Sequence, residues 1–375
     1  FYSKLAKVRH YIHEHPEISE QEYEATKYIK NYLSELEIKP LDYPLETGVI
    51  AEIGSGLPII ALRADIDALP IVERTNLDYA SSNGAMHACG HDFHQTSLLG
   101  AAEILKEREA ELNGTVRLIF QPAEENFQGG YKVIEAGGLE NVSAIIGYHN
   151  NPHLKPGQMG LRSGAIMAGV EQFKVIVNGV SAHAARPDLG VDTVLVITTI
   201  INNLQNIVSR TVSPFESAVL SVTHIDVGTT WNVLPANGYF EGTIRSFDPE
   251  VRLSVIERFE KVVKAVSQQF DARVEINWGN APNVTFNDRD LTPIIFENSK
   301  KFAEVIETLP STGGEDFAAY QEKIPGVFAF VGSNGEENAP DWHHDDFIVR
   351  DESLPVAVNY FVESAFALLN HFKKE

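Results

Sequence analysis

The chain has 375 residues, of which 43% are hydrophobic and 22% are charged, a balance typical of a globular protein. At roughly 100–200 residues per domain, this length favours two domains. The formal net charge is −22, from 30 Lys and Arg against 52 Asp and Glu. A surface this acidic would repel a phosphate backbone or an anionic membrane, so we expect neither nucleic acid nor a membrane as a partner.

The chain contains one cysteine, Cys89, which excludes an intrachain disulfide. Metal binding, catalysis and simple burial remain as its roles. The first residues carry no export-signal pattern, and no apolar run approaches the roughly 18 residues that a membrane helix needs. These features favour a cytoplasmic location.

The chain begins with a helical pattern over residues 4–36 that is interrupted at Pro16. Short apolar runs follow at residues 59–62, 116–120, 144–148 and 327–331. Such runs are typical of strands buried on both faces of a sheet that helices cover. Between the first two runs, residues 93–111 predict a helix with Asp92 as N-cap and Gln95 as its capping-box partner.

The middle of the chain has a different pattern of predicted strands and helices. It predicts a strand at 171–177, a helix at 191–210, strands at 218–227 and 238–247, a helix at 249–270 and a strand at 272–278. This order is that of a ferredoxin-like α+β domain. We therefore expect residues 170–280 to form an inserted lid or dimerisation domain. Residues 1–169 and 281–375 would form an α/β catalytic domain with a mostly parallel, helix-covered sheet.

The helix predicted at 191–210 is apolar around most of its circumference. Such a helix is usually buried on more than one side. It is either a core helix covered by the rest of its domain or a contact between two subunits, and the sequence favours neither.

The densest group of ligand-type side chains lies between His87 and His94, where Cys89 and His91 are two residues apart. Thiolate and imidazole are good ligands for zinc and other late divalent metals. Taken alone, Cys89 and His91 could also have structural roles, as a buried apolar side chain and as a hydrogen-bonded imidazole.

Further ligand-type side chains come at or after the end of each predicted strand. They are Asp65, Asp67, Glu124, Glu125, His149, His343 and His344. Ligands of open α/β sheets bind beyond the carboxyl ends of the strands, so these side chains should meet at one sheet edge. Their number suits two metal ions with one carboxylate left over to act as a base.

These residues lie in motifs that follow one another over nearly the whole chain. The motifs are RADIDALP at 63–70, MHACGHD at 86–92, FQPAEE at 120–125, GYH at 147–149, SAHA at 181–184, NVLP at 232–235, GTIR at 242–245, GEDF at 314–317 and WH at 342–343. Together they resemble the aminoacylase/carboxypeptidase superfamily of dinuclear metallopeptidases. More narrowly, they are similar to its amidohydrolase branch, which includes auxin-conjugate hydrolases, hippurate hydrolase and N-acetyl-diaminopimelate deacetylases.

The resemblance implies two divalent metal ions, with zinc or manganese as the first choices and cobalt or nickel as alternatives. Cys89 would bridge the ions, His91 and Glu125 would be terminal ligands, and His149 and His343 would complete the set. Asp345 replaces a proline that the family pattern expects, so the choice between His343 and His344 stays open.

The resemblance also implies roles for residues that do not bind metal. Glu124 would be the general base, and His183 would supply an oxyanion donor across a dimer interface. The substrate carboxylate would be bound by Asn232, Arg245, Gly313 and Gly314. Asp65 and Asp67 would orient ligand imidazoles, a usual task for carboxylates near a metal. The remaining histidines have no ligand-like setting and are interpreted as structural or surface residues: His10, His13, His15, His94, His153, His224 and His371.

The implied activity is metal-dependent hydrolysis of the amide bond of an N-acyl amino acid, in a homodimer formed through the inserted domain or in a homotetramer. Closure of the inserted domain would complete the site. Small peptides are the alternative substrates, for a dipeptidase, carboxypeptidase or aminopeptidase. A metal-binding or ligand-binding protein without turnover is the non-enzymatic alternative. A mononuclear zinc deaminase is excluded, because its ligand set requires more than one cysteine.

Overall fold

The structure is a computed structural model, and it describes residues 1–373. The chain folds into two compact units. The first unit contains Phe1–Ile166, Thr285–Leu309 and the chain from Asp316 onward, and the second contains Met167–Val284 and Pro310–Glu315. The second unit is thus larger than the predicted range 170–280. Residues 310–315 join the second unit because they bond to its first residues: the Ala168 N–H donates to the carbonyls of Ser311 and Gly313.

The first unit is built on a seven-stranded sheet. Its order is β1 (Val49–Gly54), β3 (Thr115–Gln121), β2 (Ile59–Asp65), β4 (Val142–Asn151), β15 (Gly326–Gly332), β5 (Gln158–Leu161) and β14 (Glu304–Glu307). The four central strands β3, β2, β4 and β15 are parallel. β6 (Gly164–Met167) and β13 (Thr285–Asn287) form a separate two-stranded ribbon. The four predicted apolar runs are confirmed as these four central strands, and the mostly parallel sheet is confirmed with them.

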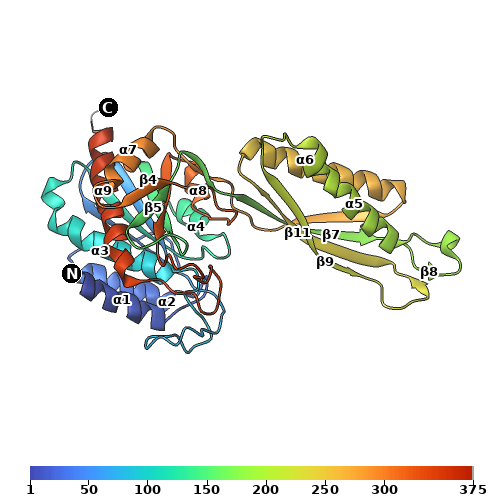
Figure 1. Cartoon of the computed structure of the whole chain (residues 1–375), viewed down its shortest axis with the longest axis horizontal. Helices are drawn as coiled ribbons and strands as arrows, with labels where there is room; N and C mark the ends of the chain where they lie inside the picture. The colour runs from blue at the N-terminus through green and yellow to red at the C-terminus, as the bar shows by residue number, and fades with distance from the viewer. Residues whose placement is uncertain (374–375) are drawn as a thin grey trace. The chain divides into compact units, whose positions relative to one another are not determined.

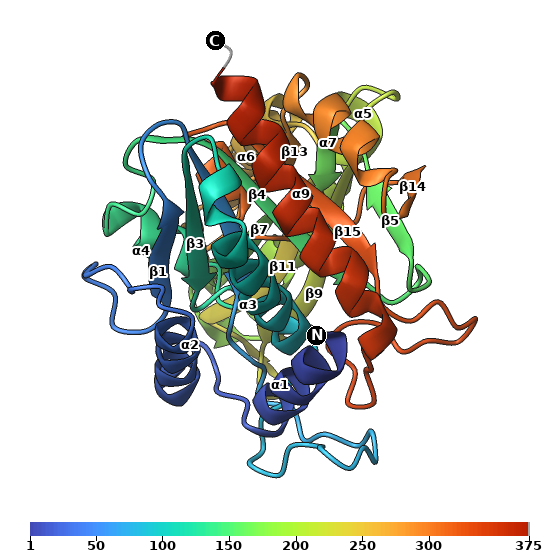
Figure 2. The same ribbon diagram turned by 90° about the vertical axis from the view of Figure 1, so that its left-hand side faces the viewer.

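Helices cover both faces of this sheet (Figures 1 and 2). On one face lie α1 (Tyr2–Glu14), α2 (Tyr23–Glu35), α3 (His91–Glu107), α7 (Leu291–Ser299) and α9 (Leu354–Phe372). On the other lie α4 (Gly129–Glu135) and α8 (Ala318–Gln321). Short 3₁₀ helices occur at Glu109–Glu111, Pro187–Leu189 and Asp351–Ser353. None of the helices within residues 1–373 combines the length and the hydropathy that a membrane-spanning segment requires.

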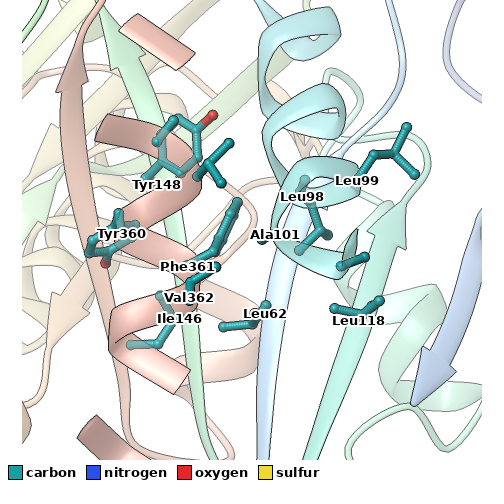
Figure 3. Packing of buried hydrophobic residues seen from close by; sticks show 14 of the residues in the cluster. Leu62, Leu98, Leu99, Ala101, Leu118, Ile146, Tyr148, Tyr360, Phe361 and Val362 are labelled. Atoms are coloured by element: carbon teal, nitrogen blue, oxygen red, sulfur yellow. The ribbon is translucent and has the colours of Figure 1, made fainter. Parts of the chain in front are cut away.

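The core of the first unit lies between the sheet and the helices α3 and α9 (Figure 3). Leu98 of α3 and Phe361 of α9 pack over Leu62 of β2 and Ile146 of β4, and all four are fully buried. Each such side chain contributes about 1.5–3 kcal/mol when removed from water. This packing holds α3 against the sheet, so its first turn stays at the carboxyl ends of the parallel strands.

The start of α3 differs from the prediction. The helix begins at His91 after Gly90, which has φ +83°, and no side chain caps it. The prediction that Asp92 is an N-cap is wrong. Asp92 lies inside the first turn, where its carboxylate accepts hydrogen bonds from Arg9 Nη1 and His13 Nδ1, both at 3.0 Å. The Asp92 carboxylate is thus bound by two buried side chains of α1 and caps no backbone N–H of α3.

The second unit has the predicted ferredoxin-like order. Its elements are β7 (Gly169–Asn178), α5 (Thr193–Thr211), β9 (Ala218–Val227), β11 (Asn237–Ser246), α6 (Pro249–Gln269) and β12 (Arg273–Trp278). The four strands form an antiparallel sheet in the order β12-β7-β11-β9, and α5 and α6 lie on one face of it (Figure 1). A small ribbon, β8 (Ala182–His183) with β10 (Val233–Leu234), extends from the sheet.

The apolar helix α5 has an inner and an outer surface. Val196, Ile200 and Leu204 are fully buried against the sheet, which makes α5 a core helix. On its outer side, Val194 and Leu195 are 40% and 49% exposed. The core interpretation therefore accounts for one side of α5 only, and a subunit contact through the other side stays a prediction.

Candidate metal centre

The five predicted metal ligands lie together at the carboxyl ends of the central strands. Cys89 Sγ is 3.3 Å from His149 Nε2, and His91 Nε2 is 3.8 Å from Glu125 Oε1. His343 Nε2 is 3.4 Å from Glu125 Oε2. The residues come from five parts of the first unit: the loop before α3, the first turn of α3, the loop after β3, the end of β4 and the loop after β15. Their donor atoms form overlapping groups in which all atoms lie within 4.8 Å of one another.

The geometry distinguishes the two adjacent histidines of the last motif. His343 has φ +66°, and its backbone N–H donates to the Ala88 carbonyl at 2.9 Å, beside Cys89. This contact places the His343 imidazole against Glu125. Both imidazoles are more than half exposed, but that of His344 pairs with Asp346 instead, with Nδ1 2.6 Å from Oδ1. Of the two, His343 is therefore the one that faces the cluster.

The cluster has the properties of a cation site. Within the described part of the chain, His91 Nε2 and Glu125 Oε1 are buried and make no hydrogen bond. Buried polar atoms without hydrogen-bond partners are costly, and a cation coordinated by both atoms, which lie 3.8 Å apart, would remove that cost. Burial raises the pKa of Glu125 to about 7. Burial, with the charges of Glu125 and Glu124, also raises the pKa of Cys89 well above its ordinary value. A bound cation reverses such shifts, so the donor set fits the predicted metal ions.

Asp67 orients two of the proposed ligands at once. Its Oδ1 is 3.1 Å from His91 Nδ1, and its carbonyl oxygen is 2.9 Å from the same nitrogen. Its Oδ2 accepts from the backbone N–H of Glu125 at 3.0 Å and from Ser19 Oγ at 2.7 Å. With Nδ1–H donated to Asp67, Nε2 of His91 faces the cluster and is the atom that would bind a metal ion, the arrangement that metal-binding histidines adopt.

The buried carboxylate of Asp65 lies between the guanidinium of Arg63 and the imidazoles of His94 and His91. Its Oδ2 accepts from Arg63 Nη1 at 2.7 Å, and its Oδ1 is 2.6 Å from His94 Nδ1 and 3.7 Å from His91 Nε2. Arg63 Nη2 also donates to Asp316 Oδ1 at 2.7 Å, so the guanidinium is held on two sides. Asp65 therefore contacts His94 more closely than the predicted ligand His91.

Three buried residues beside the cluster were not predicted from the sequence to belong to it. His94 lies one turn after His91 on the same helix, a spacing that could have indicated it. Asn150 directly follows His149, but an asparagine at a strand end carries no specific signal. Glu22 lies just before α2, far from any motif, and no pattern in the sequence pointed to it.

Glu124, the predicted base, lies at the edge of the ligand cluster. It is 5% exposed, and its Oε2 is 3.9 Å from His91 Nε2. The residue before it, Ala123, has φ +54°, an unusual conformation for a residue with a Cβ. The chain therefore turns sharply between β3 and the two glutamates, so that Glu124 and Glu125 both face the cluster.

In the second unit, His183 and Asn232 lie on neighbouring segments. β8 pairs with β10 so that His183 stands opposite Val233, and the Ala184 N–H donates to the Asn232 carbonyl at 3.0 Å. His183 is exposed, and its Nδ1 accepts from the Ala185 N–H at 3.0 Å. Because a backbone N–H can only donate, Nε2 of this imidazole carries the proton and is a hydrogen-bond donor.

Arg245 lines an open hollow of about 690 Å³ within the second unit, together with Arg210, Ser213, Glu216 and Thr312. Its Nη1 lies 3.5 Å from the Thr312 carbonyl, next to Gly313 and Gly314. Desolvation lowers the pKa of Arg245, and no acidic group contributes to the shift. A partly desolvated guanidinium in a protein of net charge −22 is an attractive partner for an anion.

Comparisons with known proteins agree with this architecture. The model of Peptidase family M20/M25/M40 matches residues 61–367. An N-acetylcysteine deacetylase of Bacillus subtilis is 45% identical over 378 residues, covering 100% of this chain and 99% of the relative. An IAA-amino acid hydrolase of Arabidopsis thaliana is 38% identical, covering 97% of this chain and 86% of the relative.

A solved structure gives the same result. A dinuclear metal-binding peptidase of the M20 family from Bacillus subtilis superimposes with a TM-score of 0.87 at 44% identity, with 98% of each chain covered. Sequence and fold thus agree over nearly the whole length. The chain belongs to Peptidase family M20/M25/M40.

Proposed function

We propose that this protein is a metal-dependent amidohydrolase that removes the acyl group from an N-acyl amino acid. The observation that carries the proposal is the position of Glu124, whose carboxylate lies 3.9 Å from His91 within a cluster of Cys, His and Glu donors. The names of the relatives, an N-acetylcysteine deacetylase and an IAA-amino acid hydrolase, favour N-acyl amino acids over peptides as substrates.

The residues that would hold the metal ions are Cys89, His91, Glu125, His149 and His343. When bound, a pair of divalent cations supplies Lewis acidity that polarises an amide carbonyl and lowers the pKa of a water molecule. A donor set of one thiolate, three imidazoles and one carboxylate suits zinc and other late divalent metals, and we propose zinc or manganese as the physiological ions.

Glu124 has the position and chemistry of a general base. Its carboxylate can accept a proton from the attacking water and return the proton to the leaving amine. The backbone of its neighbour Glu125 is held by a hydrogen bond from the Glu125 N–H to the Asp67 carboxylate. The products would be a carboxylic acid and a free amino acid.

We assign substrate recognition to the second unit. Arg245 would pair with the substrate carboxylate, helped by Asn232 and by backbone groups of Gly313 and Gly314. The exposed His183, with Nε2–H as a donor, would stabilise the negative charge that develops on the carbonyl oxygen. The first unit would carry out the chemistry, and the second would act as a lid.

A homodimer through the second unit fits its exposed surface, and a homotetramer is the alternative. β9 is an edge strand of its sheet, and Val219 and Ile225 on this strand are 46% and 49% exposed. Val194 and Leu195 are further exposed apolar residues, on the outer side of α5. An open strand edge with apolar side chains is a common template for pairing with a second copy.

The proposal is tested by metal analysis combined with a substrate panel of N-acetyl and N-benzoyl amino acids and dipeptides. We expect two metal ions per chain, release of free amino acid from members of the acyl panel, and loss of activity after exhaustive chelation. Glu124→Gln should retain both metals and lower kcat by about 10²–10⁴-fold. Activity that survives chelation would contradict the proposal, as would two bound metals with no hydrolysis of any compound.

A further inference from the structure

We infer that Asn150 is a positioning residue of the metal centre, which joins the separate chain segments that carry the ligands. The inference rests on the proposed function, because it assumes that Cys89, His149 and His343 bind metal. Asn150 is completely buried at the end of β4, directly after His149. Both its backbone and its side-chain amide are hydrogen-bonded to the surroundings of the cluster.

The backbone of Asn150 determines the orientation of two imidazoles. Its carbonyl oxygen lies 2.8 Å from His149 Nδ1, which leaves Nε2 of His149 facing Cys89 Sγ. Its N–H donates to His94 Nε2 at 3.0 Å. Because an amide N–H can only donate, Nδ1 of His94 carries the proton and donates to Asp65 Oδ1 at 2.6 Å.

The side-chain amide of Asn150 joins two further segments. Its Nδ2 donates to the Cys89 carbonyl at 2.6 Å and lies 3.1 Å from His94 Nε2. Its Oδ1 accepts from Ser333 Oγ at 3.2 Å and from Trp342 Nε1 at 3.3 Å, and Trp342 directly precedes His343. The opposite amide orientation would place Oδ1 against the Cys89 carbonyl and Nδ2 against the indole N–H, so only one orientation pairs all these groups.

Gly90 packs closely against the side-chain amide of Asn150. A Cβ at Gly90 would lie 2.4 Å from Asn150 Nδ2, so the turn that carries Cys89 can approach the amide only with glycine at this position. Gly90 also has φ +83°, which favours glycine independently. The Cys89 turn, the end of β4 and the loop of Trp342 and His343 therefore meet at one buried amide.

Asparagine is suited to this position because it supplies a donor and an acceptor from one rigid planar group. Asn150→Asp keeps the shape but replaces the donor by an oxygen that faces the Cys89 carbonyl and the His94 lone pair. Outer partners of metal ligands typically contribute 10–100-fold to metal affinity. We expect Asn150→Asp to weaken metal retention by about this factor.

The matched control is Asn151→Asp, the same substitution at the next residue. Asn151 is only partly buried, and its Oδ1 accepts from the His153 N–H at 2.9 Å, a role that a carboxylate oxygen can also fill. Trp342→Phe is a milder variant at the rim of the cluster, because it removes the indole N–H and keeps an aromatic ring beside His149. It tests the same amide should Asn150→Asp fail to fold.

The experiment measures metal per chain after equilibration with increasing chelator, together with the thiolate-to-metal absorption of the cobalt(II)-substituted proteins. Asn150→Asp should release metal at least about tenfold more readily than the wild type and should have altered absorption. Trp342→Phe should change in the same direction by less, and Asn151→Asp should match the wild type. Circular dichroism of the metal-free proteins verifies the fold.

Two results would overturn the inference, and they are distinguishable from each other. Folded Asn150→Asp and Trp342→Phe proteins with wild-type metal retention and absorption would overturn the positioning role and leave the proposed function intact. A wild-type protein that binds no metal would overturn the proposed function, and the inference with it.

Discussion

The carboxylate of Glu22 accepts a hydrogen bond from the backbone N–H of Ala123, with an N–O distance of 2.8 Å, across 101 residues of sequence. Ala123 has φ +54° and directly precedes the proposed base Glu124. An L-residue in this left-handed conformation costs about 1–2 kcal/mol, so it persists only where the surrounding structure holds it. Glu22 also accepts from Thr47 Oγ1 at 2.8 Å and is itself fully buried, which makes it a rigid anchor.

Glu22→Ala should therefore lower kcat without removing the metal ions. Loss of the anchor lets the turn at Ala123 relax, and a displacement of about 1 Å at a catalytic group can cost about 10²-fold in rate. Glu22→Gln retains an oxygen acceptor for the Ala123 N–H and should restore most of the activity. Steady-state kinetics with metal analysis measures the effect. Equal losses in the Ala and Gln variants would argue against a positioning role. Glu24→Ala, on the exposed side of α2, is the control.

Cys89→Ser should reduce metal occupancy more than it reduces fold stability. The side chain is small and buried, and serine fills nearly the same space, but an alcohol is a much poorer ligand than a thiolate for late divalent metals. We expect fewer than two metal ions per chain after dialysis, while the unfolding midpoint of the metal-free protein stays within a few degrees of wild type. Full occupancy by two metals in this variant would show that the thiolate is not required to bridge them.

Arg245→Met should impair substrates that carry a free carboxylate. Hydrogen bonds to a charged group contribute about 1.5–3 kcal/mol, which corresponds to roughly 10–100-fold in kcat/KM. Substrates in which the carboxylate is replaced by a carboxamide should be much less sensitive to the substitution. Arg273→Met, at an exposed position of β12, is the matched control. If both substrate types lose activity equally, Arg245 does not recognise the carboxylate.

His13 should stabilise the fold in a pH-dependent way. Its Nδ1 and Nε2 lie 3.0 Å from Asp92 Oδ2 and Glu73 Oε1, so the ring is flanked by two carboxylates. Burial alone would lower the pKa of His13, but the charges of Asp92 and Glu73 outweigh burial and raise the pKa to about 9. With a usual pKa near 6.5, the contribution is fully present below about pH 6.5 and is lost as the pH rises through about 9.

The measurement compares the free energy of unfolding of wild type and His13→Gln at pH values on both sides of this window, at constant metal concentration. The variant should be less stable at about pH 6.5, by at most about 3 kcal/mol, and the difference should shrink above about pH 9. Glu73 has a pKa lowered to about 2, so it stays charged throughout this range. A difference that does not depend on pH would mean that His13 is not protonated in the folded protein.

The residue types and their local spacing predicted much of this protein. Runs such as residues 116–120 identified buried strands, and the alternation in residues 171–278 identified the ferredoxin-like insert, because periodicity follows directly from which faces are buried. The rule that ligands gather at the carboxyl ends of parallel strands predicted that Glu125 and His149 would meet. Both the chemistry of these side chains and their positions at strand ends can be read along the chain.

The contacts that organise the site are decided by tertiary structure. Local pattern predicted Asp92 as a helix cap, but Arg9 and His13, about 80 residues earlier, bind its carboxylate. Glu22 reaches Ala123 and Asn150 reaches Trp342 across 101 and 192 residues. A hydrogen bond depends on which atoms the packed elements bring within about 3 Å, and neither spacing nor composition encodes that distance. The sequence by itself therefore determined which chemical groups the centre contains, and only the folded chain decided how each group is oriented.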